Sequence, residues 1–600
     1  MIATTLRTIA GRTLRRRASL TPRALLASAV ASFALAAHVH AQAQAPATAP
    51  VRASKEMVVT ANRYASEAGL EILREGGNAV DAAIAVQLVL SLVEPQSSGI
   101  GGGAFMLLYD EPNGGGKPLI VAYEGRETAP AAATPDMFLA DNGRAASFAQ
   151  VGVGGLSVGV PGVLRMLELA HREHGKLPWA KLFEPAIALA DQGFVVSVRL
   201  HALLDGFKRF ARAEEFRRHF YDAAGEPLPS GTKLKNPDYA ATLRLLAAKG
   251  AEPMYSGELA EAIVRTVREN NVRAGRLTLD DMKRYVAHES EPLCSPYRTW
   301  KVCGPQLPSS GGVTTQQILK MLSRFELAEL RDDRVTSIHL ISEASRLAFA
   351  DRNFYLGDPG FVPAPVAGLL DPRYVDARAA AIDLKRALPA VKPGAPAGVA
   401  AWNFAPTAAA ERPSTSHFSI VDRSGDAVSM TTSVQGAFGS QLMAGGFILN
   451  NELTDFDYEP ESGGKPVANR IEGGKRPLSS MAPTLVLDDR ERLRLVVGSP
   501  GGTQIIGFVV QTLVGVLDWK LDVQQAVAAP HFLAQEGPVE LEQGTALAAD
   551  AAALGALGHT TAVRVMNSGL HAIAIDYADG HEKTLSGAVD PRREGVALGD

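Results

Sequence analysis

Residues 414–433 read STSHFSIVDRSGDAVSMTTS and contain two short runs of strand-forming residues. The first run covers residues 415–421 and the second covers residues 427–433, and β-branched or aromatic residues are frequent in both. The segment between them, DRSGD at 422–426, consists of residues that are typical of turns. This pattern predicts a β-hairpin whose first strand begins at Thr415.

The segment before this hairpin has a different composition. Residues 386–414 read RALPAVKPGAPAGVAAWNFAPTAAAERPS, in which Pro and Ala dominate and no periodicity is visible. Such a composition is typical of an extended, exposed linker. The linker ends at Ser414-Thr415, so we expect it to separate a helix-rich first part of the chain from a strand-rich second part.

Hydrophobic periodicity predicts the other elements. In the first part we expect two helices within 57–95, helices within 161–193, and helices near 238–248, 257–270, 314–328 and 336–351, with strands at 104–109 and 119–123. In the second part we expect strands at 447–450, 484–487, 493–497 and 572–575 and a helix near 503–517.

The composition indicates a folded globular protein. The chain has 600 residues, of which 46% are apolar and 21% charged, and its mean hydropathy is +0.02. A disordered low-complexity chain is excluded, because it would have fewer apolar residues or far more Gly and Pro. The formal net charge is −4, and the acid-free, Arg-rich residues 1–41 make the remainder more acidic still. We therefore expect no nucleic-acid partner.

Residues 1–41 have the three parts of a secretory signal peptide. Residues 1–23 are Arg-rich, residues 24–37 are small or apolar, and VHA at 39–41 provides small residues for cleavage. A membrane anchor is the alternative, but a span needs roughly 20 apolar residues and this run is shorter. We expect cleavage after residue 41, a periplasmic or secreted protein, and no membrane span in the mature chain.

The chain has two cysteines, Cys294 and Cys303, within LCSPYRTWKVCG. Strand-forming flanks and a turn-like centre predict a hairpin with the two sulfurs opposite each other. Export to an oxidising compartment favours a disulfide over the alternative of two free thiols.

Two motifs that suggest cofactor or metal sites lack the required context. The glycine-rich run at 99–103 follows a predicted helix and precedes a strand, whereas a dinucleotide-binding loop follows a strand and opens a helix. The histidines of HREH at 171–174 do not have the spacing of a zinc helix. We interpret the glycine run as a tight turn and predict no metal and no organic cofactor.

Several ordered motifs then identify a resemblance. The chain resembles the γ-glutamyltranspeptidases, a family of the N-terminal-nucleophile hydrolase superfamily. The motifs that carry the resemblance are ASEAGLEILREGGNAVDAA (65–83), EPQSSGIGGGAFM (94–106), RE (126–127), PSSGG (308–312), ADRNFYLGDP (350–359), STSHFS (414–419), NNELTDF (450–456), RPLSSMAPT (476–484), GSPGG (498–502) and GAVDPR (587–592).

The resemblance implies an α+β fold, a four-layer αββα sandwich built by both halves of a self-cleaved chain. The cut lies between Ser414 and Thr415, which leaves a large subunit, 42–414, and a small subunit, 415–600, as a heterodimer. Thr415 then supplies both the nucleophilic hydroxyl and, through its new α-amine, a general base. A reference pKa of about 7.7–8.0 suits that amine to this role near neutral pH.

The resemblance also implies roles for other residues. Gly501 and Gly502 match the oxyanion pair, since glycine lets backbone N–H groups come close to the reacting carbonyl. Ser433 stands where members usually have Thr and keeps the hydroxyl that supports the nucleophile. The residues implied in substrate binding are Arg126, Ser479 and Ser480 for an α-carboxylate, Glu452 and Asp455 for an α-ammonium, and Gln435, which stands where many members have Asn.

The spacing of Glu452 and Asp455 adds a geometric expectation. Residues three apart point away from each other on a strand but together on a turn, so a shared role in binding requires a turn here. Residues 457–475 contain two Gly-Gly pairs and are expected to form a mobile lid, as in some members of the family.

The implied function is γ-glutamyl transfer from glutathione or other γ-glutamyl amides to water, an amino acid or a dipeptide. One alternative is a glutaryl- or cephalosporin-type acylase, which has the same nucleophile but needs no ammonium site. A second alternative is an inactive binding relative that never matures, and the intact Thr415, Gly501, Gly502 and Arg126 argue against it.

Overall fold

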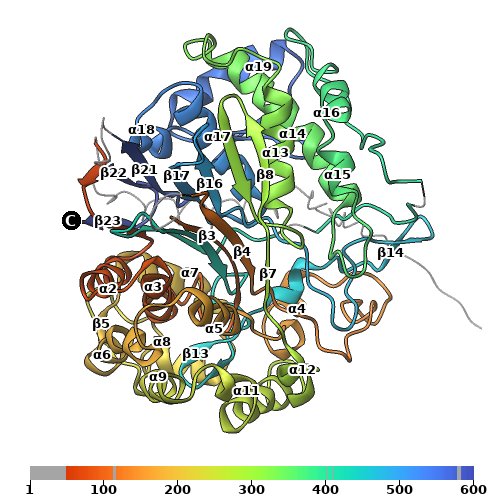
Figure 1. The fold of residues 1–600 in the computed structure, drawn as a ribbon. Coiled ribbons are helices and arrows are strands. Elements are labelled where there is room, and N and C mark those ends of the chain that lie inside the picture. The colour runs from red at the N-terminus through yellow and green to blue at the C-terminus, as the bar shows by residue number, and fades with distance from the viewer. Residues whose placement is uncertain (1–48, 112–115, 401, 410, 578–582) are drawn as a thin grey trace, which may run out of the picture. The chain divides into compact units, whose positions relative to one another are not determined.

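The computed structural model describes residues 49–111, 116–400, 402–409, 411–577 and 583–600. The predicted signal peptide at 1–41 lies outside the described residues. These described residues belong to one compact unit. This unit contains two seven-stranded antiparallel sheets with helices on the outer face of each (Figure 1).

The first sheet holds the predicted hairpin. Its strand order is β23-β2-β10-β11-β3-β4-β7, so the hairpin strands β10 and β11 lie at its centre between β2 and β3. The strands are β2 (Met57–Thr60), β3 (Gly103–Asp110), β4 (Leu119–Glu124), β7 (His288–Ser290), β10 (Ser416–Val421), β11 (Ala427–Ser433) and β23 (Val596–Gly599).

The second sheet has the order β1-β22-β21-β17-β16-β9-β8. Its strands are β1 (Val51–Ala53), β8 (Leu293–Tyr297), β9 (Trp300–Gly304), β16 (Thr484–Leu487), β17 (Leu493–Gly498), β21 (His571–Tyr577) and β22 (Lys583–Val589). Both sheets combine strands from before and after residue 415, so the two parts of the chain share each sheet.

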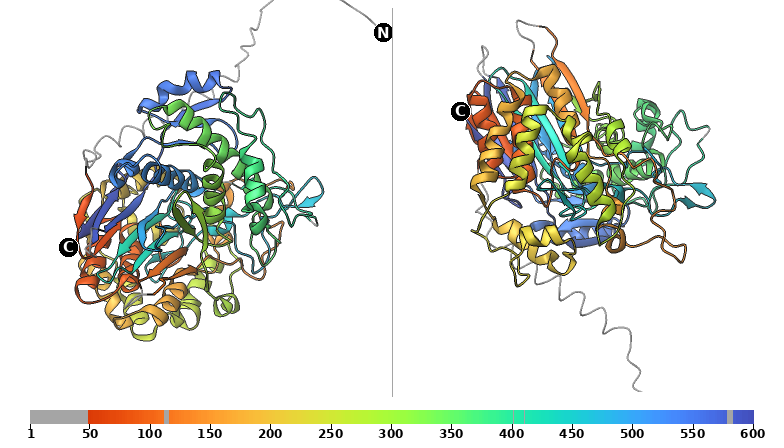
Figure 2. Two further views of the ribbon diagram at one scale, coloured as in Figure 1. Left: turned by 45° about the horizontal axis from the view of Figure 1, so that its top comes forward. Right: turned by 90° about the horizontal axis from the view of Figure 1, so that it is seen from below.

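The helices form the two outer layers (Figures 1 and 2). Those packed on the first sheet include α2 (Arg63–Arg74), α3 (Ala79–Val93), α5 (Val163–His174), α6 (Glu184–Gln192), α7 (Val198–Phe207), α8 (Glu214–Phe220), α9 (Pro237–Lys249), α10 (Glu252–Tyr255), α11 (Glu258–Glu269) and α12 (Leu279–Arg284). Those on the second sheet include α13 (Ser310–Leu322), α14 (Arg334–Tyr355), α16 (Pro372–Ala379), α17 (Ile505–Leu517), α18 (Val523–Ala528) and α19 (Ala551–Ala556). The short helices α4 (Phe148–Val151) and α15 (Val366–Leu369) lie in connections.

The alternation of side chains along the strands explains the layering. In β10 and β11, Phe418 and Met430 pack toward the first helical layer, whereas Val421 and Ala427 belong to the core between the sheets. In β16, Leu485 also faces that inter-sheet core. Because each sheet buries both faces, the unit has the four-layer αββα arrangement that the resemblance implies.

The prediction of helix within 57–95 is wrong at its start. Residues 57–60 (MVVT) form strand β2, and the first helix begins only at Arg63, after Asn62 accepts a hydrogen bond from the Tyr64 N–H as its N-cap. A run of Met, Val and Thr favours a strand once neighbouring strands are present, and here β10 and β23 pair with it.

The linker before the hairpin also differs from the expectation of an exposed segment. It has almost no regular structure, but several of its described residues are packed. The Trp402 ring lies 5.1 Å from the Tyr355 ring, and the Ala405 N–H donates to the Pro466 carbonyl at 2.8 Å. The Thr407 hydroxyl is bonded to Asp457. The linker therefore follows a defined path before it reaches Ser414.

The segment predicted as a lid, 457–475, runs beside this linker. It contains the small hairpin of β14 (Glu461–Ser462) and β15 (Lys465–Pro466), which projects from the side of the unit (Figure 2).

Cys294 and Cys303 lie opposite each other in β8 and β9 and are joined by a disulfide. No helix within the described part of the chain is both long and apolar enough to cross a membrane.

Candidate active site

The predicted nucleophile lies where the central hairpin opens. Ser416 pairs with Thr432 across β10 and β11, so Thr415, just before one strand, lies beside Ser433, at the end of the other. The Thr415 hydroxyl donates to the Ser433 Oγ at 3.3 Å, and both residues are buried. The Ser433 Oγ also accepts the Gln435 backbone N–H at 2.8 Å, which leaves it oriented toward the threonine.

The chain at Thr415 is strained. Its φ is +92°, a value that a β-branched residue rarely adopts, and such backbone strain costs about 1–3 kcal/mol. Hydrogen bonds hold it in place: the Arg593 guanidinium donates to the Thr415 carbonyl at 3.0 Å, and the Ser414 hydroxyl donates to the Gln96 carbonyl at 2.9 Å.

One of the two predicted oxyanion glycines contacts the bond that is expected to break. Gly501 and Gly502 connect the end of β17 to α17, and the Gly501 N–H donates to the Ser414 carbonyl at 3.2 Å. Gly502 has a φ of +59°, and a Cβ there would lie 2.6 Å from the Glu411 carbonyl oxygen. The Gly501 N–H therefore contacts the oxygen that carries the negative charge when the Ser414 carbonyl becomes an oxyanion.

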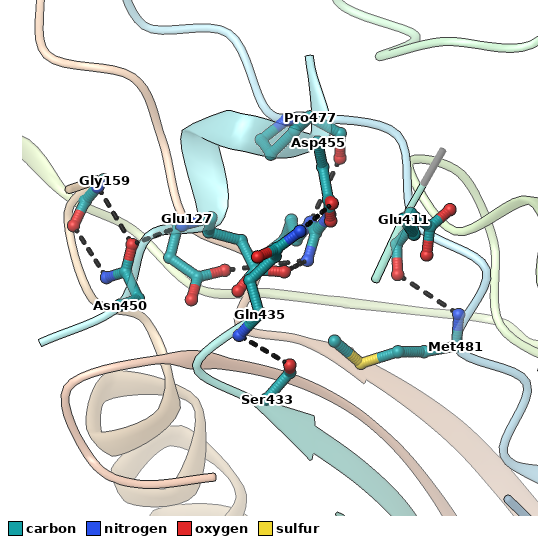
Figure 3. A network of polar contacts seen from close by, with 12 residues as sticks. Glu127, Gly159, Glu411, Ser433, Gln435, Asn450, Asp455, Pro477 and Met481 are labelled. Carbon is teal, nitrogen blue, oxygen red and sulfur yellow. Dashed lines mark hydrogen bonds and ion pairs between the residues drawn. The ribbon is translucent and has the colours of Figure 1, made fainter. Parts of the chain in front are cut away.

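The glycine-rich turn at 99–103 supports the same end of the hairpin. A Cβ at Gly102 would lie 1.9 Å from the Ser433 carbonyl oxygen, and one at Gly101 would lie 2.2 Å from the Ile448 oxygen. Asn450 bridges this turn to Gly159 by hydrogen bonds of 2.8–3.0 Å from its side chain (Figure 3). The run is therefore a closely packed turn.

Glu452 and Asp455 lie together on one turn of 3₁₀ helix, η5 (Glu452–Asp455). Arg126 is fully buried against them: its Nη2 donates to Asp455 Oδ2 at 2.8 Å, and its Nη1 is ion-paired with Glu452. The Gln435 side chain donates to Asp455 Oδ1 at 2.8 Å. Figure 3 shows Gln435 between Ser433 and Asp455. Arg126 is thus engaged by the two acids.

Burial makes these acids difficult to ionise. It raises the pKa of Glu452 to about 8, with the nearby Glu127 adding to the effect, and it raises the pKa of Asp455 to about 7. Among the described residues, Glu452 Oε2 and Gln435 Oε1 are buried and have no hydrogen-bond donor. The cluster therefore offers acceptors, and in its ionised form negative charge, to a ligand that carries N–H groups.

Ser480 has two partners that sequence reasoning missed, Arg352 and Glu411. The Arg352 Nη2 donates to Ser480 Oγ at 2.7 Å, and Ser480 donates its backbone N–H and its hydroxyl to Glu411 at 2.9 and 2.7 Å. Ser479 lies next to them, and its carbonyl accepts from the Ser310 N–H and hydroxyl. Arg352 belongs to the ADRNFYLGDP motif, and this motif is the feature of the sequence that could have identified it as a site residue.

Several of these groups meet at one small cleft. It is lined by Glu411, Arg412, Thr415, Ser433, Gln435, Glu452, Asp455, Met481, Gly502 and Ile505. No group of three or more His, Cys, Asp or Glu in the described residues is placed to hold a metal ion. The structure therefore brings Thr415, Gly502 and the acidic pair to one place.

Comparison with known proteins agrees with this arrangement. Residues 65–600 match the family model described as Gamma-glutamyltranspeptidase. The Glutathione hydrolase proenzyme of Bacillus subtilis is 37% identical over 558 residues, which cover 90% of this chain and 91% of that protein. The Acylase ACY 1 proenzyme of a Pseudomonas strain is 35% identical over 561 residues, which cover 92% of this chain and 94% of that protein.

A solved structure is also similar. The crystal structure of cephalosporin acylase from Bacillus halodurans superimposes with a TM-score of 0.80 at 26% identity, covering 93% of this chain and 98% of that one. The fold, the arrangement around Thr415 and the match over residues 65–600 lead to one conclusion: the chain belongs to the γ-glutamyltranspeptidase family.

Proposed function

We propose that the protein is a self-processing enzyme that cleaves γ-glutamyl amides, glutathione among them, and passes the γ-glutamyl group to water or to an amino acid or dipeptide. It matures by a cut between Ser414 and Thr415 into two subunits. Similar relatives are named proenzymes. The subunits would remain associated as a heterodimer because each sheet contains strands from both.

Self-cleavage uses the groups around Thr415. Its Oγ, with Ser433 as hydrogen-bond partner, attacks the Ser414 carbonyl carbon, and the Gly501 N–H stabilises the oxyanion on that carbonyl oxygen. Breakage of the C–N bond leaves an ester on Thr415 Oγ and a free Thr415 amine. Water then hydrolyses the ester, which gives Ser414 a terminal carboxylate and restores the hydroxyl.

Turnover repeats this chemistry on the donor. The free α-amine of Thr415 accepts the hydroxyl proton as Oγ attacks the γ-carbonyl carbon of the donor. The proton passes to the leaving amine as the amide bond breaks, and the γ-glutamyl group remains as an ester on Thr415. Water or an acceptor amine then attacks that ester and releases the product.

One observation carries the choice of a γ-glutamyl donor. Glu452 Oε2 and Gln435 Oε1 are buried acceptors at the cleft that holds Thr415, and neither has a donor among the described residues. A γ-glutamyl group carries an α-ammonium with three N–H donors, whereas a glutaryl group has none to offer. Leaving such acceptors unpaired costs free energy, so an ammonium ligand fits this site best.

A related acylase is the second candidate. Arg126 already pairs with Glu452 and Asp455, which reduces the negative charge available to an ammonium, and a relative named as an acylase is almost as similar as the glutathione hydrolase. An acyl group with a carboxylate and no ammonium suits a site in which Arg126 offsets the negative charge of the two acids.

Two measurements test the proposal. Intact mass under denaturing conditions should show two chains, the smaller beginning at Thr415, and Thr415→Ala should yield one uncut, inactive chain. The mature protein should then hydrolyse γ-glutamyl-p-nitroanilide with a higher kcat/KM than glutaryl-p-nitroanilide. The reverse preference would favour the acylase, and a cut, active Thr415→Ala variant would exclude the assigned nucleophile.

A further inference from the structure

Arg593, near the C-terminus, contacts the nucleophilic residue itself. Its Nη1 donates to the Thr415 carbonyl at 3.0 Å, and its Nη2 donates to the Asn567 carbonyl at 3.2 Å. The segment before β21 leaves room for this side chain, because a Cβ at Gly569 would lie 2.7 Å from Arg593 Cδ. Both acceptors are uncharged carbonyls, so these hydrogen bonds hold the guanidinium beside Thr415 without neutralising it.

The charge of Arg593 also lacks a direct ionic partner. Its neighbour Arg592 is ion-paired with Glu542 and Asp590, but Arg593 forms no such pair with an acid in the described part of the chain. Its Nε is buried and has no hydrogen-bond acceptor among the described residues. Because an arginine stays protonated in a protein, its full positive charge acts on the groups around it.

Glu94 is the acid that most opposes this charge. It is the C-cap of α3, is 2% exposed, and accepts from Gln96 Nε2 at 2.5 Å. The Gln96 carbonyl in turn accepts from the Ser414 hydroxyl at 2.9 Å. Burial lowers the pKa of Arg593, and among the neighbouring acids Glu94 counteracts this effect most. The acid is thus connected to Ser414 and the cation to Thr415, one on each side of the bond that is expected to break.

The contact between Arg593 and Thr415 should remain after the cut. Ser416 is already paired with Thr432 in the centre of the first sheet, so the Thr415 carbonyl is held by the strand that follows it. The nitrogen and carbonyl oxygen of one residue are about 3 Å apart, which places the guanidinium roughly 6 Å from the new α-amine. Repulsion between the two positive charges disfavours the protonated amine, and only an unprotonated amine can accept the hydroxyl proton.

We propose that Arg593 is a positioning residue for the nucleophile: it holds the Thr415 backbone through its carbonyl, and its charge keeps the α-amine formed by the cut in the unprotonated state that serves as base. The inference rests on the proposed function and deepens it, since it names the group that prepares this base. The other charged or titratable groups near Arg593 and the cleft are Glu94, Arg199, His571, Asp590, Glu594, Glu411, Arg412, Glu452 and Asp455. The acids among them oppose the effect of Arg593 and reduce its size.

The first test is the pH dependence of kcat/KM for γ-glutamyl-p-nitroanilide, which should rise as the Thr415 amine loses its proton. Arg593→Gln removes the cation and raises the pKa of the amine, so the rise should move about one unit to higher pH. The loss should then be about tenfold below the rise and small above it. Arg593→Lys keeps a charge and should leave the position of the rise nearly unchanged. An Arg593→Gln profile lowered equally at every pH would show a purely structural role and overturn the proposal.

Glu94→Gln tests the same electrostatic effect with the opposite sign. Burial raises the pKa of Glu94 to about 7, so above that pH its ionised form offsets Arg593. Glutamine keeps the shape and an acceptor for Gln96, and the rise in kcat/KM should move about half a unit to lower pH. Arg373→Gln removes an arginine whose side chain is 92% exposed and should leave the profile unchanged. If Arg593→Gln does not fold or is not cut, Glu94→Gln decides, and no shift or a shift to higher pH refutes the inference.

The second test needs no turnover. 1-Fluoro-2,4-dinitrobenzene reacts with unprotonated amines, so the pH dependence of its reaction with Thr415 gives the pKa of the amine. The product is read from the mass of the N-terminal peptide of the small subunit. The pKa should be about one unit higher in Arg593→Gln than in the wild type.

The outcomes separate this inference from the proposed function. Equal pKa values in a cut wild type and a cut Arg593→Gln variant would refute the role of Arg593, even if both cleave γ-glutamyl donors. A cut protein that cleaves no γ-glutamyl donor would refute the proposed donor, whereas labelling of its amine would still decide the role of Arg593. A wild-type chain that stays uncut would refute both.

Discussion

Gly502 offers a sharp test of how the linker is packed in the uncut chain. A Cβ at this position would lie 2.6 Å from the Glu411 carbonyl oxygen and 2.7 Å from that of Arg412, both in the linker. Gly463 in the β14–β15 hairpin is a matched control, because its φ is +58° against +59° for Gly502 and a Cβ there would meet nothing within 4 Å. The two Gly→Ala changes therefore share the backbone strain and differ in the contact.

The magnitudes follow from that difference. A left-handed backbone conformation costs an alanine about 1–2 kcal/mol, so this amount is subtracted from the free energy of unfolding of both variants. Overpacking against the linker backbone adds about 1–3 kcal/mol for Gly502→Ala alone. We expect the free energy of unfolding to fall by about 1–2 kcal/mol in Gly463→Ala and by about 2–5 kcal/mol in Gly502→Ala.

The assay is urea unfolding in the Thr415→Ala background, so that neither cutting nor catalysis enters the comparison. The denaturant midpoints should differ while the slopes agree. Equal midpoints for Gly502→Ala and Gly463→Ala would show that Glu411 and Arg412 do not lie against Gly502 in solution.

Two further predictions concern the chemistry of the site. Ser433→Ala removes the hydroxyl 3.3 Å from Thr415 Oγ1 and should slow self-cleavage about 100-fold, whereas Ser433→Thr should cut at a rate near that of the wild type, as followed by intact mass. L-Glutamate should bind the mature enzyme more tightly as pH rises through about 7, because burial raises the pKa of Asp455 to about 7 and only its ionised form attracts the ammonium. Glutarate, which has no ammonium, is the control, and the same pH dependence for both ligands would contradict the ammonium site.

Local sequence patterns predicted those elements whose own residues form a recognisable pattern. The hairpin that begins at Thr415 combines strand-forming runs with a polar turn. The spacing of Glu452 and Asp455 left a strand and a turn open, and the structure shows a turn of 3₁₀ helix. Residues 57–60 lacked such a signal, since a run of four residues has no period to measure. Their strand exists because β10 and β23, far away in sequence, lie on either side of it.

The contacts of Arg352 and Glu411 with Ser480 were missed for a related reason. Arg352 ends a helix, Glu411 lies in a Pro- and Ala-rich linker, and Ser480 follows another connection, so no local pattern joins them. Composition indicated that the linker is exposed, because Pro and Ala have little to bury. Individual side chains such as Trp402 and Thr407 nevertheless anchor it, and composition averages over such residues.

The residues just before Thr415 lie against both predicted oxyanion glycines. The Ser414 carbonyl accepts the N–H of Gly501, and the Glu411 and Arg412 carbonyls lie close to Gly502. In the proposed reaction, the cut at Ser414 therefore has two consequences at once. It creates the amine that acts as base, and it frees the segment that covers these two glycines. An uncut chain would then lack both the base and an accessible oxyanion site.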